Sequence, residues 1–307
     1  MWDFALFATG CFCAAIGGEL FVQGLLGIAQ RGRLPTGVVA ATLGAFATSS
    51  PELVVGVTSA LRGVPEISLG DVLGSNVVNI ALILAIPMVI AGLRTTYEST
   101  FRDLPFALVI FPAIWFVARD GRIDAADALI LLAVFLLWFV LVLVWAVRNR
   151  TPDDGTSRTS GALLLAITIV GLLTLFLAGQ LIVTGATGLA TAAGLPAFLI
   201  GATLVAFGTS VPELATVVVS SMRGHHEVGL QTILGSNIFN TLLIIPVAAL
   251  IHPITVNWAG VSLALAFGFG VTLLTAPVVG SRLGRWRGVA LLAAYTAFIA
   301  MSLASVH

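Results

Sequence analysis

The chain contains no lysine, and only 9% of its 307 residues are charged. A soluble domain carries roughly 25% charged residues, so this composition excludes a large water-soluble domain. The 59% hydrophobic content and the mean hydropathy of +1.10 are typical of a membrane protein. The net charge is zero, and the loops are too short and too mixed in sign to form a nucleic-acid surface.

Cysteine is almost absent as well. Cys11 and Cys13 both lie in the first apolar run, and their spacing fits neither a zinc site nor an extracellular disulfide framework. The amino terminus lacks the basic segment of a signal peptide and continues into a long apolar run. We therefore expect this segment to be a retained first span.

Apolar windows of about 20 residues predict ten transmembrane helices. A polar, turn-rich stretch at 148–160 separates them into two groups of five. The sequence thus predicts an all-α polytopic membrane protein with five-helix units at 1–147 and 161–307, joined by a cytoplasmic linker at 148–160. The predicted helices cover 4–29, 36–61, 67–92, 104–118, 124–147, 161–189, 197–222, 229–251, 258–279 and 286–304.

Two motifs recur at a fixed offset of 161 residues. AFATSSPEL (45–53) returns as AFGTSVPEL (206–214), and LGSNVVN (73–79) returns as LGSNIFN (234–240). Aligning 35–79 with 196–240 without a gap gives 22 identities, which identifies a duplication. Because each copy has five helices, an odd number, the second copy must enter the membrane from the opposite side. This arrangement is an inverted-topology repeat of the kind found in secondary transporters.

Arginine is unevenly distributed over the predicted loops. Alternate loops hold 11 arginines on one side of the membrane, whereas the other side has only Arg62, Arg119 and Arg122. The positive-inside rule then predicts that both termini lie outside the cytoplasm, in a multi-pass protein of the cell (inner) membrane. At the helix turns, the sequence pairs Arg62 with Glu66 and Arg223 with Glu227.

Two glutamates, Glu52 and Glu213, lie well inside predicted spans. A charged residue at that depth costs about 2.5–3.5 kcal/mol on insertion scales, so it normally faces a cavity and has a function. Pro51 has no N–H for the carbonyl of Ala47, and Pro212 has the same effect near Gly208. We expect each helix to break there and to expose carbonyl oxygens beside the carboxylate.

Further oxygen-bearing residues share these helical faces. Ala45, Thr48, Ser49 and Glu52 fall on one face, and the equivalent residues are Ala206, Thr209, Ser210 and Glu213. Ser75 with Asn79, and Ser236 with Asn240, lie one turn apart on the helices that follow. Such a set suits hard cations such as Ca²⁺ and Na⁺ rather than metals that prefer thiolate or imidazole.

Two other interpretations concern the same residues. A cluster of Ser, Thr, Asn and Glu side chains could simply join helices, but its duplication, with a proline and a midspan glutamate in each copy, argues against that interpretation. Asp71 lies one turn before Ser75, where the second copy has Thr232. It remains open as a helix cap, a vestibule residue or a ligand.

These motifs resemble the calcium/cation antiporter superfamily and, within it, the prokaryotic sodium/calcium exchangers. The family pattern is a G-[TS]-S-x-P-E block followed by G-S-N-x-x-[ND] in each of two inverted repeats. Here the blocks read ATSSPE with GSNVVN, and GTSVPE with GSNIFN. The resemblance covers essentially the whole chain. It implies a secondary antiporter of Na⁺ and Ca²⁺, with the lipid bilayer as its surroundings and no cofactor or obligate protein partner.

The resemblance also implies a role for each matching residue. Glu52 and Glu213 would be the central ligands, and Thr48 and Thr209 would add backbone carbonyls at the calcium site. Ala45 with Ser49, and Ala206 with Ser210, would form flanking sodium sites. The remaining cage would come from Ser75, Asn79, Ser236 and Asn240.

The chain departs from the family pattern in two places. Many exchangers have aspartate at one of the positions of Asn79 and Asn240, and Ala47 replaces a glycine. Two central carboxylates leave a charge of −2, which one Ca²⁺ neutralises, whereas three Na⁺ leave +1. The resemblance implies 3:1 electrogenic exchange, but the missing carboxylate leaves the stoichiometry and the coupling ion open.

Other functions are compatible with parts of the pattern. A proton-coupled calcium antiporter would use the same glutamates, since adjacent carboxylates favour protonation of one of them. A cation channel would require a continuous pore. A hydrolase is disfavoured because the sequence has no H-E-x-x-H motif and no histidine within a span to activate Ser49 or Ser210. We therefore expect a transporter and not an enzyme.

Overall fold

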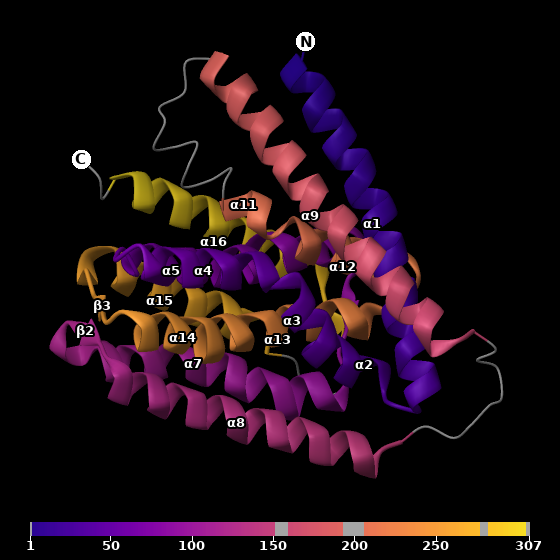
Figure 1. Ribbon diagram of the computed structural model, residues 1–307, viewed down its shortest axis with the longest axis horizontal. Coiled ribbons are helices and arrows are strands. Elements are labelled where there is room, and N and C mark those ends of the chain that lie inside the picture. Colours follow the sequence, from indigo (N-terminus) through magenta and orange to yellow (C-terminus); the bar gives the residue numbers. More distant parts are fainter. Residues whose placement is uncertain (1, 151–158, 193–205, 277–281, 305–307) are drawn as a thin grey trace.

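The computed structural model describes residues 2–150, 159–192, 206–276 and 282–304, and helices form nearly all of its regular structure (Figure 1). The label η marks π-helical turns, except η4, which is a 3₁₀ turn. The first half consists of α1 (Trp2–Gly32), α2 (Thr36–Val39), η1 (Ala40–Gly44), α3 (Ala45–Thr48), α4 (Ser50–Leu61), α5 (Glu66–Val78), η2 (Asn79–Leu84), α6 (Ala85–Ala91), β1 (Leu93–Arg94), η3 (Ser99–Asp103), α7 (Leu104–Val117), η4 (Ala118–Asp120), β2 (Arg122–Ile123) and α8 (Ala125–Arg148).

The second half repeats this order. Its elements are α9 (Gly161–Ala192), α11 (Ala206–Thr209), α12 (Val211–Met222), α13 (His226–Phe239), η6 (Asn240–Ile244), α14 (Ile245–Ile251), β3 (Ile254–Thr255), α15 (Trp258–Leu274), β4 (Arg282–Leu283) and α16 (Arg285–Ala304). Helical structure occurs in each of the ten predicted segments. Part of the segment predicted at 197–222, and the end of the one predicted at 258–279, lie outside the described residues.

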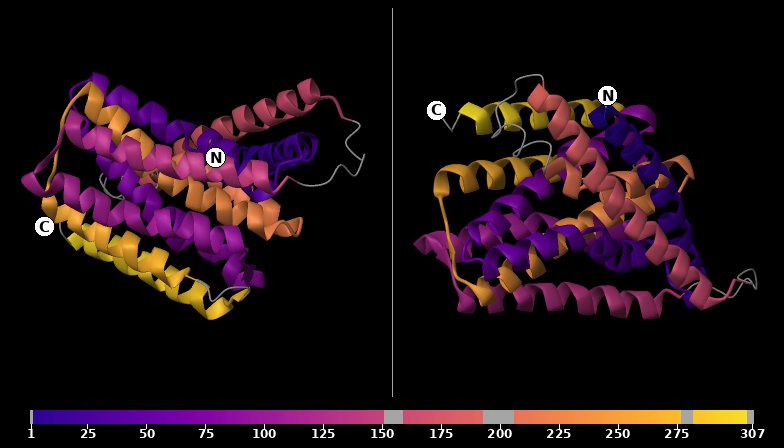
Figure 2. Two further views of the ribbon diagram at one scale, coloured as in Figure 1. Left: turned by 90° about the horizontal axis from the view of Figure 1, so that it is seen from below. Right: turned by 45° about the horizontal axis from the view of Figure 1, so that its top comes forward.

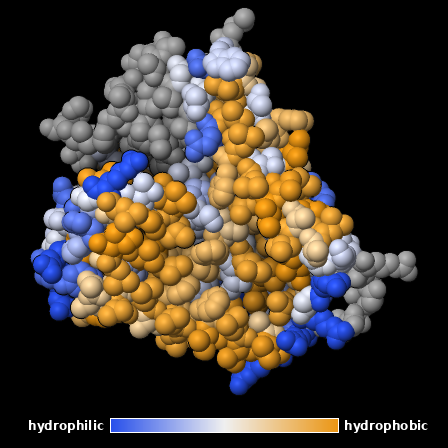
Figure 3. Space-filling view, in the orientation of Figure 1, coloured by the Kyte–Doolittle hydropathy of each residue, from blue (hydrophilic) through white to orange (hydrophobic). Residues whose placement is uncertain are grey.

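The number of helices that qualify as spans is smaller than the ten predicted. By length and composition, six described helical stretches could cross a membrane, or seven if the bent pair Thr36–Thr48 and Ser50–Leu61 counts as one. Residues 193–205 and 277–281 lie outside the described part of the chain, so the helical stretches that contain α12 and α15 are too short to qualify in this count. Figure 3 shows a broad hydrophobic surface with hydrophilic residues toward its two sides. The exposed leucines and valines of α8 are part of the chain's apolar exterior.

Two small antiparallel sheets join the halves, and the sequence did not predict them. β1 and β3 begin 161 residues apart and are therefore equivalent by the repeat, as are β2 and β4, which begin 160 apart. Each sheet pairs one strand with the non-equivalent strand of the other half, β1 with β4 and β2 with β3. A two-fold relation between the halves requires this exchange. The pairs are Leu93 with Leu283, Arg94 with Arg282, Arg122 with Thr255, and Ile123 with Ile254.

Helices α1 and α9 lie side by side, antiparallel and oblique to the rest of the bundle (Figures 1 and 2). Glycines allow this close contact. A Cβ atom at Gly171 would meet the backbone of Phe21, and one at Gly10 would lie 2.8 Å from Cγ1 of Ile182. Small residues are what allow two helix backbones to approach each other in a membrane.

Helix α13 occupies the centre of the molecule, and all its residues from Val228 to Phe239 are buried. Its position depends on Gly235, where a Cβ atom would collide with the carbonyl oxygen of Ala41 and lie 2.8 Å from Cβ of Ala45. Gly74, the equivalent residue in α5, has no described atom within 4 Å of such a Cβ. Among the described residues, this close approach therefore occurs at Gly235 and not at Gly74. The segment equivalent to Ala41–Gly44 lies outside the described residues.

The predicted ion pairs at the helix turns are wrong. Arg223 pairs with Glu19 of α1, and Glu227 lies 3.4 Å from Nδ1 of His225. In the described part of the chain, Arg62 and Glu66 form no ion pair. A distant carboxylate that approaches through packing has displaced the local partner of Arg223.

We predict that Gly235→Ala lowers the thermal stability of the purified protein. The added methyl group must displace the backbone at Ala41, and overpacking of this kind typically costs about 1–3 kcal/mol. Gly70→Ala is the matched control, because Gly70 is exposed and a Cβ there meets no described atom within 4 Å. Unfolding temperatures in detergent test the prediction, and equal values for the two variants would contradict it.

Candidate cation-binding site

The predicted helix breaks are present at equivalent positions in both halves. Ser49 leaves the helical conformation, with φ −82° and ψ 8°, and Ser210 does the same, with φ −89° and ψ 8°. In the first half, the axes before and after the break differ by 44°. Pro51 and Pro212 stand in the first turn of the helix that follows each break, where the missing N–H of proline is tolerated.

Each break places a glutamate in the first turn of a new helix. Glu52 lies in the first turn of α4 and Glu213 in the first turn of α12, and both side chains are 0% exposed. The partial positive charge of a helix N-terminus favours a carboxylate there. The two carboxylates are near enough for their charges to repel, and neither joins an ion pair within the part of the chain that the structure describes. No described side chain therefore neutralises the negative charge of these two carboxylates.

Hydroxyl groups from both halves surround Glu213. Ser49 Oγ donates to Oε1 of Glu213 over 3.4 Å, and Ser236 Oγ donates to the same oxygen over 3.3 Å. Thr48 Oγ1 lies 3.4 Å from Ser236 Oγ. Thr209 lies correspondingly beside Glu52. These hydrogen bonds are long. They bring side chains from both copies of the repeat together around the Glu213 carboxylate.

Several buried oxygens at this point have no hydrogen-bond partner. A buried acceptor without a partner costs about 1–3 kcal/mol, so such atoms are uncommon in a folded protein. A hard cation coordinated by these oxygens would satisfy several of them at once. The atoms are Oε1 and Oε2 of Glu52, Oε2 of Glu213, Oγ of Ser75 and Ser210, and Oδ1 of Asn79 and Asn240.

A second pair of asparagines, Asn76 and Asn237, orients these amides. Asn79 Nδ2 donates to Oδ1 of Asn237 over 3.0 Å, and Asn240 Nδ2 donates to Oδ1 of Asn76 over 3.5 Å. Asn237 Nδ2 in turn donates to the Asn76 carbonyl over 3.1 Å. With their nitrogens engaged across the two halves, Asn79 and Asn240 keep their oxygens for another ligand.

Asn76 and Asn237 were not among the residues predicted from the sequence. Both stand in the G-S-N block and are identical in the two copies, so the repeat itself carried the signal. The sequence also gave no indication of the π-helical turns η2 and η6, which begin at Asn79 and Asn240. Such turns loosen the backbone ladder and frequently occur at functional sites.

The remaining predicted residues also lie at the breaks. Ala45 is buried, and its carbonyl accepts from Ser49 N over 2.9 Å and from Thr48 Oγ1 over 3.3 Å. Ala206 begins α11, and its side chain lies outside the described residues. The structure thus brings Glu52, Glu213 and their neighbouring hydroxyls and amides together around the two breaks.

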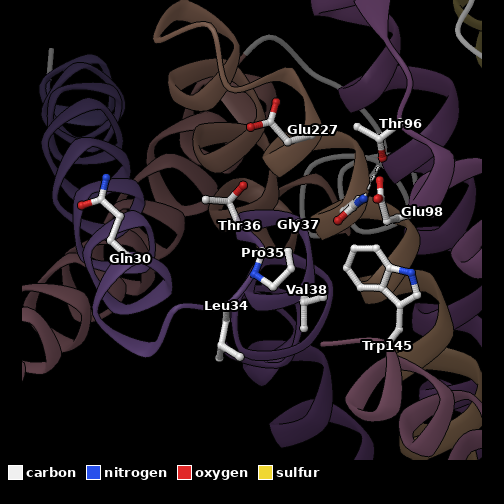
Figure 4. Close-up of a pocket in the computed structure, with 11 residues that line it drawn as sticks. Gln30, Leu34, Pro35, Thr36, Gly37, Val38, Thr96, Glu98, Trp145 and Glu227 are labelled. Atoms are coloured by element: carbon white, nitrogen blue, oxygen red, sulfur yellow. Dashed lines mark hydrogen bonds between the residues drawn. The ribbon is translucent and has the colours of Figure 1, made fainter. Parts of the chain in front are cut away.

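Two cavities lie near the site but differ in their relation to it. One of about 410 Å³ is lined by Pro51, Pro212 and Thr209 together with Gly179 and Gln180 of α9, so it reaches the breaks. Another of about 390 Å³ is shown in Figure 4 and contains Glu98, Glu227 and Gln231 in its wall, but none of the predicted ligands. The Gln231 side chain packs tightly against Gly37 there.

Comparison with known proteins places this geometry in a family context. The family model described as sodium/calcium exchanger protein matches residues 2–144 and 163–304. The sodium/calcium exchanger MaX1 of Methanosarcina acetivorans is 27% identical over 346 aligned residues, covering 97% of each chain. The inner membrane protein YrbG of Escherichia coli is 27% identical over 285 residues, covering 87% of this chain and 86% of that protein.

A solved structure has the same fold. It is the sodium-calcium exchanger NCX_Mj soaked with 10 mM Na⁺ and 10 mM Sr²⁺, and it superimposes with a TM-score of 0.83 at 27% identity. The superposition covers 97% of this chain and 98% of the other. Our chain therefore has the multi-span helical membrane fold of that exchanger.

We predict that Asn237→Ala weakens Ca²⁺ binding although Asn237 is not itself a proposed ligand. Removing it frees the Asn79 amide to turn, and losses of about 10–100-fold in metal affinity are typical for such supporting residues. The Ca²⁺-induced rise in unfolding temperature, measured over a titration, reports the affinity. Asn149→Ala, in an exposed residue that bonds the Trp145 carbonyl, should leave the titration unchanged. An unchanged Asn237→Ala titration would contradict the prediction.

Proposed function

Because this chain belongs to the sodium/calcium exchanger protein family, we propose that it exchanges Na⁺ for Ca²⁺ across the membrane. Membership makes it a cation/calcium antiporter and not an enzyme, and the choice of Na⁺ as the coupling ion is our proposal. The observation that carries it is the pair of buried carboxylates, Glu52 and Glu213, which come from opposite halves and lack any cationic partner in the described part of the chain.

Each half contributes the same set of ligands in this proposal. Glu52 and Glu213 hold Ca²⁺ between them, with the backbone carbonyls of Thr48 and Thr209. The unpartnered oxygens of Ser75, Asn79, Ser210 and Asn240 support their inclusion. Na⁺ occupies flanking positions and competes for the same carboxylates. The Na⁺ positions are formed by Ala45 with Ser49 and by Ala206 with Ser210, and Ser236 completes the cage.

We propose ten spans in two inverted five-helix repeats, with both termini outside the cytoplasm. Three observations support this topology. The sheets pair non-equivalent strands of the two halves, arginines lie mainly on one side, and one relative is named an inner membrane protein. The linker at 148–160 then lies in the cytoplasm.

Transport proceeds by alternating access in this proposal. Two bare carboxylates in a medium of low dielectric repel strongly, so closure around an empty site is unfavourable. A Ca²⁺ ion, or several Na⁺ ions, removes that repulsion and allows the site to change sides. Helices α1 and α9 are the moving elements, because they lie obliquely across the bundle and α9 lines the cavity that reaches the breaks.

A proton-coupled calcium antiporter is the alternative that the same residues could support. It would replace Na⁺ by protons on Glu52 or Glu213. A cation channel is a further alternative, which would require a continuous pore, and counterflow of labelled Ca²⁺ would argue against it.

We predict that Glu52→Gln and Glu213→Gln each abolish Ca²⁺ transport in proteoliposomes while expression remains near normal. An amide keeps the shape of the carboxylate but halves the charge of the site. Glu66→Gln removes an exposed carboxylate from the same region and should transport normally. Robust Ca²⁺ exchange by either site variant would remove the central claim.

We predict that ⁴⁵Ca²⁺ uptake follows an outwardly directed Na⁺ gradient and not a proton gradient. With three Na⁺ per Ca²⁺, each cycle moves one net charge, worth about 2.3 kcal/mol per 100 mV. Uptake should accelerate when valinomycin and a K⁺ gradient make the vesicle interior positive, because the exiting Na⁺ carries the excess charge.

The same measurement distinguishes the alternatives. A rate that ignores the clamped potential under a steady Na⁺ gradient would indicate 2:1 exchange. Uptake that follows protons and ignores Na⁺ would identify the proton-coupled antiporter.

A further inference from the structure

The two halves share nearly all the polar residues of the site, but they differ at one position. Asp71 of α5 is equivalent to Thr232 of α13, and each stands one helical turn before the serine of the G-S-N block. Residues four apart on a helix lie on the same face. Asp71 therefore continues the face of Ser75 and Asn79, and Thr232 continues that of Ser236 and Asn240.

The environment of Asp71 excludes a helix cap. Helix α5 begins at Glu66, so Asp71 stands in its second turn, beyond the positions whose N–H groups need a cap. Its Oδ2 atom is shielded from solvent and has no hydrogen-bond partner. In the described chain, no arginine or histidine forms an ion pair with it. A shielded carboxylate in this condition is one that a cation would stabilise.

Asp71 also acts on Glu52, one of the two central carboxylates. Its negative charge is near enough to Glu52 to repel it, although no three acidic or imidazole side chains gather at one point in the residues described. Asp71 therefore stands apart from the central pair. A cation that leaves Asp71 for Glu52 moves between two neighbouring negative charges.

The two equivalent positions lie toward opposite sides of the membrane in the inverted topology. Asp71 follows the turn at Arg62, on the arginine-poor side, whereas Thr232 follows the turn at Arg223, on the arginine-rich side. Thr232 is fully buried, and its Oγ1 atom has no partner. Its hydroxyl is an uncharged counterpart of the Asp71 carboxylate.

We propose that Asp71 is a capture ligand, which binds an incoming cation at the arginine-poor end of the site and passes it to Glu52. This inference rests on the proposed cation antiport but not on the identity of the coupling ion. Because Thr232 provides no charge at the other end, the site binds Ca²⁺ more tightly when it is open to the arginine-poor face. The difference between Asp71 and Thr232 thus makes the two ends of the site unequal in charge.

The test moves the charge from one end of the site to the other. Right-side-out and inverted membrane vesicles from expressing bacteria expose opposite faces, and the KM for Ca²⁺ uptake is measured in each. Asp71→Asn should raise the KM at the arginine-poor face by about tenfold or more, because a carboxylate acts strongly on a nearby divalent cation. The KM at the arginine-rich face should change little.

Thr232→Asp is the complementary variant. Its expected effect is a tighter binding of Ca²⁺, which misfolding cannot produce. In an otherwise unchanged chain it should lower the KM at the arginine-rich face, and combined with Asp71→Asn it should reverse the inequality between the faces. Glu66→Gln is the matched control, because it removes an exposed carboxylate from the same helix five residues away, and both KM values should stay at the wild-type level.

Two results would overturn the proposal. One is an Asp71→Asn protein whose two KM values equal those of the wild type. The other is a Thr232→Asp protein with no change at the arginine-rich face. A wild-type protein that takes up no Ca²⁺ under any gradient would instead overturn the proposed antiport, so the two failures are distinguishable.

Discussion

The repulsion between two buried carboxylates is the constraint on which the rest of this structure depends. Glu52 and Glu213 have no cationic partner in the described residues, and the oxygens around them are largely unpartnered. The fold tolerates this because each carboxylate lies in the first turn of a new helix, where the partial positive charge of the helix N-terminus favours it. The site is therefore built at a cost in stability, which a bound cation would remove in the function that we propose.

Much of this arrangement is predictable from the sequence, because its determinants are local. Pro51 and Pro212 remove a backbone donor from their helices, and the repeat identifies Glu52 and Glu213 as the charges shared within predicted spans. Interactions that depend on tertiary packing were missed. The sequence does not reveal that Asn237 orients Asn79 across the halves, nor that Glu19 displaces Glu227 as the partner of Arg223.

The π-helical turns and the short strands were missed for a related reason. The π-helical turns begin at Asn79 and Asn240, and apart from these two residues and Thr241 they consist of apolar residues, which form no pattern that distinguishes them from an α-helix. Strands of two residues leave no alternating pattern to detect. Both features become visible only when the two halves are placed against each other, and both lie where the halves meet.

The exchanged strand pairs restrict how such a molecule can move. β1 pairs with β4, and β2 pairs with β3. These strands lie in the loops on either side of α7 and of α15. Backbone hydrogen bonds therefore join the two halves at two separate places. If the halves pivoted against each other as rigid bodies, these hydrogen bonds would have to break in every cycle. Helices α1 and α9 carry neither strand, and they are in contact with each other along glycine-lined surfaces. In the proposed transport cycle, α1 and α9 therefore move together past a core that the two sheets hold fixed.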